Sequence, residues 1–178
     1  QGLVIGQKTI HEKTNEITAI PALLEELNIT GTTVSIDAIG CQKNITEKIV
    51  SKGADYFLAL KGNQGNLHAD VREFFESISK KRPETMDFYE STDKGHGRVE
   101  IRRCWSTSDI EWLKLGHPGW KDLTSICMVE AQRYIRGELQ IERRFYISCA
   151  EADAEKQLLF SRYHWRIENN AHWVLDVV

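Results

Sequence analysis

Two acidic residues occupy positions where a carboxylate could do chemistry. Asp37 interrupts the apolar run VSIDAIG, and a carboxylate in a buried strand needs a hydrogen bond, an ion pair or a metal ion. It lies near the carboxyl end of that predicted strand, where open α/β sheets form sites, although an aspartate capping the next turn explains the position equally well. Glu168 lies between His164 and His172 at i, i+4, i+8 spacing, on one face of a predicted helix. That face suits a metal ion or a phosphate; a solvated polar stripe is the alternative.

Two further stretches could bind phosphate. In LALKGNQGNL a predicted strand enters a glycine-containing loop and then a helix, with Lys61, Asn63 and Gln64 in the loop. Backbone amides at a helix N-terminus attract phosphate, but GxxxxGK[ST] is absent and a simple turn is the alternative. In HGRVEIRR, Arg98 and Arg102 are four apart and share a strand face, which predicts either a phosphate-contacting stripe or ordinary exposed charges.

The elements that must position these residues follow from hydrophobic periodicity. Strands over residues 3–10, 33–39 and 54–60 alternate with helices from about residue 15, over 42–52 and over 66–79, which predicts an α/β fold with a largely parallel sheet. Residues 98–106, 124–135 and 139–149 alternate apolar and polar positions, as half-exposed antiparallel strands do. We expect these three strands to form one antiparallel sheet that adjoins the core but is distinct from it. A helical period returns from residue 153 to the end.

Composition excludes several classes of protein. The chain has 178 residues, 41% hydrophobic and 28% charged, so it can bury a core and is neither disordered nor membrane-spanning. The net charge of −3 argues against a general nucleic-acid binder, although the stretch 96–144 is net positive. The four cysteines form no CxxC pair, which predicts buried free thiols in a reducing cytoplasm. Without a signal peptide or an initiator Met, the chain is expected to be a piece of a longer protein.

Five strings, in order along nearly the whole chain, carry a specific resemblance. They are KTNEITAIPALLEEL, VSIDAIGCQ, GADYFLALKGNQ, HGRVEIRR and HWRIENNAHWVLDV. The sequence resembles the DDE transposases of the IS4-like superfamily, most closely the ISAs1 group, which includes the H-repeat-associated proteins. The resemblance implies an RNase H-like core, here residues 1–83 and 150–178, with a β-rich subdomain inserted at 84–149.

The resemblance also implies a catalytic role for both carboxylates. Two aspartates and a glutamate of this family hold two Mg²⁺ or Mn²⁺ ions; Asp37 matches the second aspartate and Glu168 the glutamate. The first aspartate belongs to a D-G-K motif that this sequence lacks, so we expect the chain alone to be inactive. The family's Tyr-Arg-Lys pattern does not match, since His164 stands where Arg is expected.

The resemblance implies metal-dependent DNA strand cleavage and transfer. The partners it implies are double-stranded DNA, at insertion-sequence ends and at the target, and a second copy of the chain. The place it implies is the bacterial cytoplasm, at the nucleoid. One alternative is a truncated relative that binds DNA without cutting it. Another, suggested by the acidic balance, is an α/β metal-binding protein unrelated to DNA.

Overall fold

The computed structural model describes residues 16–78, 86–95, 98–135 and 138–175, and in the last helix it describes side chains as far as Trp165. The predicted strand at 3–10 lies outside these ranges. The elements are α1 (Glu16–Glu26), β1 (Thr33–Ile36), η2 (Ala38–Gly40), α2 (Lys43–Ser51), β2 (Asp55–Leu60), η3 (Gly62–Gln64), α3 (Gly65–Ile78), β3 (Asp87–Gly95), β4 (Arg98–Thr107), α4 (Glu111–Gly116), β5 (Ser125–Ile135), β6 (Glu138–Ser148) and α5 (Ala154–Leu175).

The strands of the described ranges form one mixed sheet of six, in the order β1-β2-β6-β5-β4-β3. β1 and β2 are parallel, with Ile36 opposite Leu58, because α2 returns the chain to the starting edge between them. β2 and β6 are antiparallel, with Leu60 opposite Phe145, and the remaining pairs are antiparallel too. Among the described residues, β1 is therefore an edge strand.

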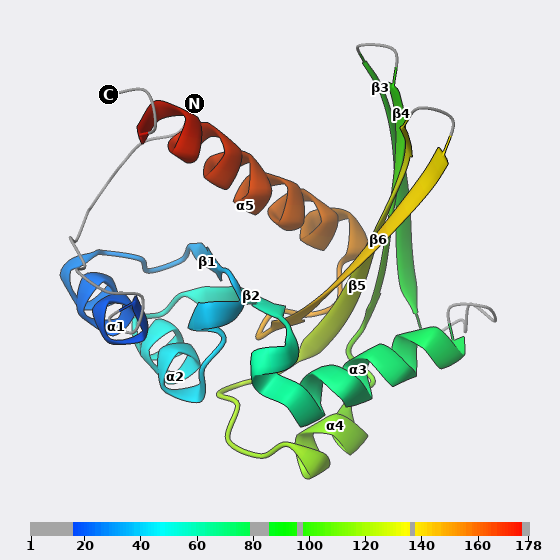
Figure 1. Cartoon of the computed structure of the whole chain (residues 1–178). Helices are drawn as coiled ribbons and strands as arrows, with labels where there is room; N and C mark the ends of the chain where they lie inside the picture. The colour runs from blue at the N-terminus through cyan, green and yellow to red at the C-terminus, as the bar shows by residue number, and fades with distance from the viewer. Residues whose placement is uncertain (1–15, 79–85, 96–97, 136–137, 176–178) are drawn as a thin grey trace.

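Helices cover both faces of the sheet, as Figure 1 shows, with α5 on one side and α2, α3 and α4 on the other. Alternate side chains of β2 explain the layering. Phe57 and Ala59 pack with Leu158 of α5, whereas Leu58 and Leu60 belong to the larger cluster on the opposite face. The fold is therefore the predicted α/β class, with a mixed sheet and flanking helices that are compatible with an RNase H-like arrangement.

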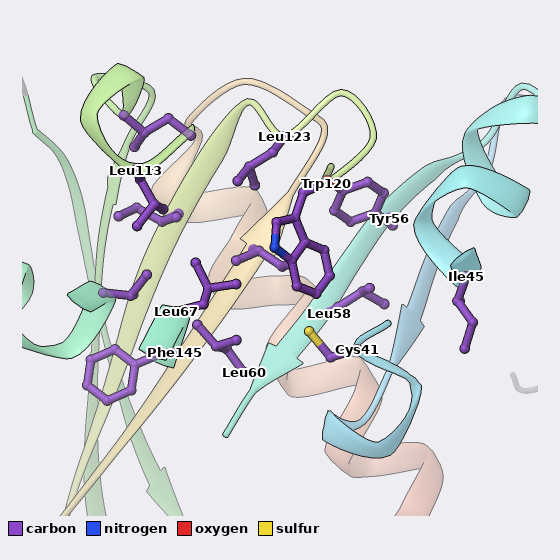
Figure 2. Packing of buried hydrophobic residues seen from close by; sticks show 14 of the residues in the cluster. Cys41, Ile45, Tyr56, Leu58, Leu60, Leu67, Leu113, Trp120, Leu123 and Phe145 are labelled. Carbon is purple, nitrogen blue, oxygen red and sulfur yellow. The ribbon is translucent and has the colours of Figure 1, made fainter. Parts of the chain in front are cut away.

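The larger cluster forms the main core, shown in Figure 2. Trp120, from the loop after α4, packs into it with 8% of its surface exposed, and Ile45, Leu58 and Phe145 are buried around it. Burying each large apolar side chain contributes about 1.5–3 kcal/mol, so this face holds α2 and α3 firmly on the sheet. Within the described ranges, no helix combines the length and apolar character needed to cross a membrane.

Two expectations about the sheet are wrong. The described sheet is not largely parallel, since only β1 and β2 run parallel. The strands of the second half do not form a separate sheet either, because β6 pairs directly with β2 and extends the first two strands. Short connections explain the first difference, since the links from β3 to β4 and from β5 to β6 can join only antiparallel neighbours.

Two elements were also missed. β3, Asp87–Gly95, is too polar to have been predicted as a strand, and α4, Glu111–Gly116, is a short helix between strands. β3 pairs along its whole length with β4. We call the four strands β3–β6 the hairpin arm; in Figure 1 their turn ends extend past the helices.

Candidate functional site

Asp37 directly follows β1 and caps the short helix η2. Its Oδ1 accepts a hydrogen bond from the backbone N–H of Ile39 at 3.1 Å, and the side chain is half-buried. Gly40 is required in this turn, because a Cβ there would collide with Cγ2 of Ile36. The predicted cap is thus present. It occupies one carboxylate oxygen, and Oδ2 has no hydrogen-bond partner among the described residues.

The last helix, α5, begins beside β3 at one edge of the sheet, and its later turns reach β1 at the other edge. The backbone N–H of Ala154 donates to Asp87 Oδ2 of β3 at 2.7 Å. Ten residues later, His164 Nδ1 lies 3.4 Å from Ser35 Oγ of β1. α5 therefore crosses the sheet and packs on β1, the strand that Asp37 follows. Glu168 and His172 lie further along α5, and their side chains lie outside the described residues.

The loop after β2 is fastened to the loop after β1. Asn63 Nδ2 donates to the Ala38 carbonyl at 2.5 Å, and Gln64 Nε2 donates to the Cys41 carbonyl at 2.8 Å. Asn63 and Gln64, two of the three loop residues predicted to bind phosphate, thus each use a side-chain N–H in a hydrogen bond within the protein. The two loops follow neighbouring parallel strands, so these bonds fix the edge of the sheet where Asp37 lies.

The predicted arginine stripe is engaged in ion pairs. Arg102 donates to Asp93 Oδ2 and Glu100 Oε2, both at 2.5 Å, and Arg162 of α5 also contacts Asp93 Oδ2, at 3.0 Å. The side chain of Arg98 lies outside the described residues. These ion pairs neutralise the charge of Arg102 and so disfavour its binding of phosphate. Phosphate binding by Arg102 stays a prediction.

Metal ligands at this edge would be oxygen atoms. Among the described residues no group of three or more His, Cys, Asp or Glu side chains is placed to hold a metal ion, but Glu168 is not in that set. The free Oδ2 of Asp37 is a hard ligand that suits Mg²⁺ or Mn²⁺. The cysteines are free, as predicted, and burial raises the pKa of the Cys41 thiol to about 12, so it is no thiolate ligand at neutral pH.

The sequence predicted only one member, Lys61, of a cluster of charged and aromatic side chains beside α5. Arg144 Cζ lies 3.7 Å from the ring centroid of Trp165, and Lys61 Nζ lies 5.8 Å from the same centroid. Lys61 is exposed at the end of β2, Arg144 belongs to β6 and Trp165 to α5. No sequence spacing reveals such a cluster, because its members come from three separate elements.

Comparison with known proteins decides the family. The family described as "Transposase DDE domain" matches residues 1–177. The chain belongs to the DDE transposases. No solved structure matches it.

Several curated proteins are similar to this DDE transposase chain. The H repeat-associated putative transposase YhhI of Escherichia coli K12 is 44% identical over 99% of the chain and 47% of its own length. The putative transposase YncI of Escherichia coli O157:H7 is 39% identical over 99% of the chain and 46% of its own length. An uncharacterized protein in the dhlA 3′ region of Xanthobacter autotrophicus is 44% identical over 85% of the chain and 50% of its own length. The chain thus spans about half the length of these relatives.

Proposed function

We propose that this chain is the catalytic part of a transposase that cleaves and joins DNA strands at the ends of a mobile element. The observation that carries the proposal is the contact between Ser35 and His164, 129 residues apart in sequence. Asp37 lies two residues beyond Ser35, on the same side of the strand. Glu168 lies one helical turn beyond His164, on the same side of α5. These two offsets favour a shared site for the two carboxylates at this edge of the sheet.

The residues of this edge fit divalent metal ions. Asp37 offers one oxygen that no described residue occupies, while the hydrogen bond from Ile39 fixes its orientation. Asn63 and Gln64 hold the surrounding loop, so the carboxylate would keep its place when a charged substrate approaches. Bound Mg²⁺ or Mn²⁺ would supply activation of a water or a 3′-hydroxyl and stabilisation of the leaving oxygen.

A third carboxylate is needed for a complete set of ligands, and we propose that it is contributed by a strand next to β1. β1 is an edge strand among the described residues, although Val34 and Ile36 are partly buried and pack against the main core. A strand edge with no neighbour among the described residues but with partly buried side chains is an unusual arrangement, because exposed strand edges invite pairing. A further strand carrying an aspartate would both cover this edge and complete the site.

We further propose that residues 84–149 are an insertion into the RNase H-like core and that the protein belongs to the ISAs1 group. The insertion would extend the core sheet through the β2–β6 pair rather than form a separate one. The H-repeat-associated name of a relative at 44% identity supports the group. Double-stranded DNA is the substrate that the transposase family favours.

Nicking of a supercoiled plasmid in Mg²⁺ or Mn²⁺ tests the function. We expect little cleavage by the 178-residue chain and clear cleavage once the coding sequence upstream is included. Asp37→Ala or Glu168→Ala should abolish cleavage by the longer protein while circular dichroism shows an unchanged fold. Undiminished metal-dependent cleavage by the Glu168→Ala protein would remove the basis for the assignment. DNA binding without cleavage by the longer protein would favour the alternative, an inactive DNA-binding relative.

A further inference from the structure

Two cationic side chains, Lys61 and Arg144, contact the indole ring of Trp165. Arg144 stacks on it, with Cζ 3.7 Å from the ring centroid, and Lys61 Nζ lies 5.8 Å from the same centroid. In the β2–β6 pair, Leu60 is opposite Phe145, so Lys61 and Arg144 come next in register on the side that faces α5. Both distances lie within the range of a cation–π interaction.

The ring itself is held by a buried network. Trp165 Nε1 donates to Tyr146 Oη at 3.4 Å, and Tyr146 Oη lies 2.9 Å from Ser161 Oγ. Tyr146 is buried and stacks on Phe57, with ring centroids 4.5 Å apart. These hydrogen bonds fix the Trp165 ring both to the sheet and to α5. The ring therefore holds the two cations that contact it in a defined position.

The charges of this cluster are not balanced. Arg144 donates through Nε and Nη2 to Glu142 Oε1, at 2.8 and 2.6 Å, which leaves Nη1 without a described partner. Lys61 has no carboxylate within ion-pair distance among the described residues. Lys61 and Arg144 thus bring two positive charges against the single described carboxylate of Glu142, so a further anion beside them would be stabilised.

We infer that Lys61 and Arg144, held on Trp165, form a clamp for a phosphate of the DNA backbone beside the catalytic edge. This inference rests on the proposed function, because Trp165 precedes Glu168 by three residues, one turn of α5. A backbone phosphate fits better than a stacked base, since the Arg144 guanidinium already covers the ring. Guanidinium and ammonium groups are the usual protein partners of phosphate, and such contacts position DNA without reading its sequence.

Salt dependence of DNA binding tests the clamp directly. Each lost phosphate contact lowers the slope of log K against log salt by about 0.9, which weakens binding about eight-fold at 0.1 M salt. We therefore expect Lys61→Gln and Arg144→Gln each to show this loss on any 20-base-pair duplex, and Lys61→Arg and Arg144→Lys to restore most of it. Unchanged slopes and affinities in the two glutamine variants would overturn the clamp.

Matched variants separate the clamp from general charge and from the catalytic proposal. Lys156→Gln, on α5 beside Asp153, and Arg72→Gln, in an exposed ion pair with Glu76 on α3, should keep the wild-type slope. An equal loss in these two controls would show a diffuse charge effect and overturn the clamp. If the slopes change as expected but no metal-dependent cleavage is ever found, the clamp stands and the proposed catalytic function fails. If metal-dependent cleavage is found but the slopes of the glutamine variants do not change, the catalytic function stands and the clamp fails.

Discussion

The charged residues of the hairpin arm and those of the candidate site are held in opposite ways. In the arm, every arginine whose side chain is described has a carboxylate partner: Arg102, Arg103, Arg133, Arg143 and Arg144. At the site, Asp37 uses one oxygen for a backbone N–H, and Lys61 has no carboxylate partner among the described residues. Carboxylates of neighbouring strands hold the arginines of the arm, whereas the Oδ2 of Asp37, the ammonium group of Lys61 and the Nη1 of Arg144 have no described partner and remain available to a ligand.

Strand register explains the pairing in the arm. Glu90, Arg103, Glu130 and Arg143 are directly opposite one another on β3, β4, β5 and β6, so charge alternates in a row across four strands. Opposite charges in directly opposed positions stabilise a sheet, and like charges there destabilise it. The count of arginines in this region therefore says little about DNA binding. What matters is which of them the carboxylates of neighbouring strands already hold.

The largest expected effect separates the two regions by activity. In the catalytically complete protein, Glu168→Gln should slow metal-dependent DNA cleavage at least about 100-fold, because a neutral amide is a poor ligand for a divalent ion. Arg133→Gln, which removes a paired arginine of the arm, should change the rate less than about two-fold. Single-turnover cleavage at saturating metal measures both. A large loss in the arm variant would break the comparison.

The second effect is on the free energy of unfolding, which should fall more for a variant in the hairpin arm than for one at the candidate site. Glu130 is 6% exposed and lies 2.8 Å from Arg143 Nε and 3.5 Å from Arg103 Nη1. Glu130→Gln should lower the free energy of unfolding by about 2–4 kcal/mol, since two arginines then face each other without the charge between them. Asp37→Asn should change it by less than about 1 kcal/mol. Urea unfolding compares the two, with the exposed Glu111→Gln as control; equal losses at Glu130 and Asp37 contradict the account.

A smaller effect should come from the loop that carries Asp37. Asn63→Ala removes the hydrogen bond to the Ala38 carbonyl, which should cost about 1 kcal/mol of stability. Cleavage by the complete protein should fall about ten-fold, because the carboxylate is then less well oriented. Asn44→Ala, exposed on α2, is the matched control and should leave both values unchanged. Wild-type cleavage in the Asn63 variant would show that this loop does not orient the site.

The smallest effect is a pH dependence. Burial raises the pKa of the Cys41 thiol to about 12 in the folded protein, from 9.0. Above pH 9 the unfolded chain loses this proton while the folded protein keeps it, so stability is present below pH 9 and declines as pH rises. The decline due to Cys41 should be about 0.7 kcal/mol between pH 8.5 and 9.5. Denaturant unfolding of wild type and Cys41→Ala measures it; the same slope in both would show that the thiol is accessible.

Sequence reasoning recovered the regular part of the fold and missed what depends on register. The helices and strands from α1 to α3 were predicted within a few residues, because their apolar side chains repeat with clear periods. β3 was missed because its charges resemble a loop until β4 supplies their partners. The position of Asp37 at the end of a strand was predictable, although β1 is only partly buried rather than buried. The Trp165 cluster was not, since it depends on how α5 crosses β2 and β6.

The central claim is that Asp37 and Glu168 share a divalent metal ion. Loading the protein with Fe²⁺ in place of Mg²⁺ and adding ascorbate and peroxide generates hydroxyl radicals that cut the backbone next to the bound ion. The account predicts cuts in two places far apart in sequence, near Asp37 and near Glu168, and predicts that Asp37→Asn abolishes both. Cuts near only one of the two residues, or an unchanged pattern in the Asp37→Asn protein, would contradict it.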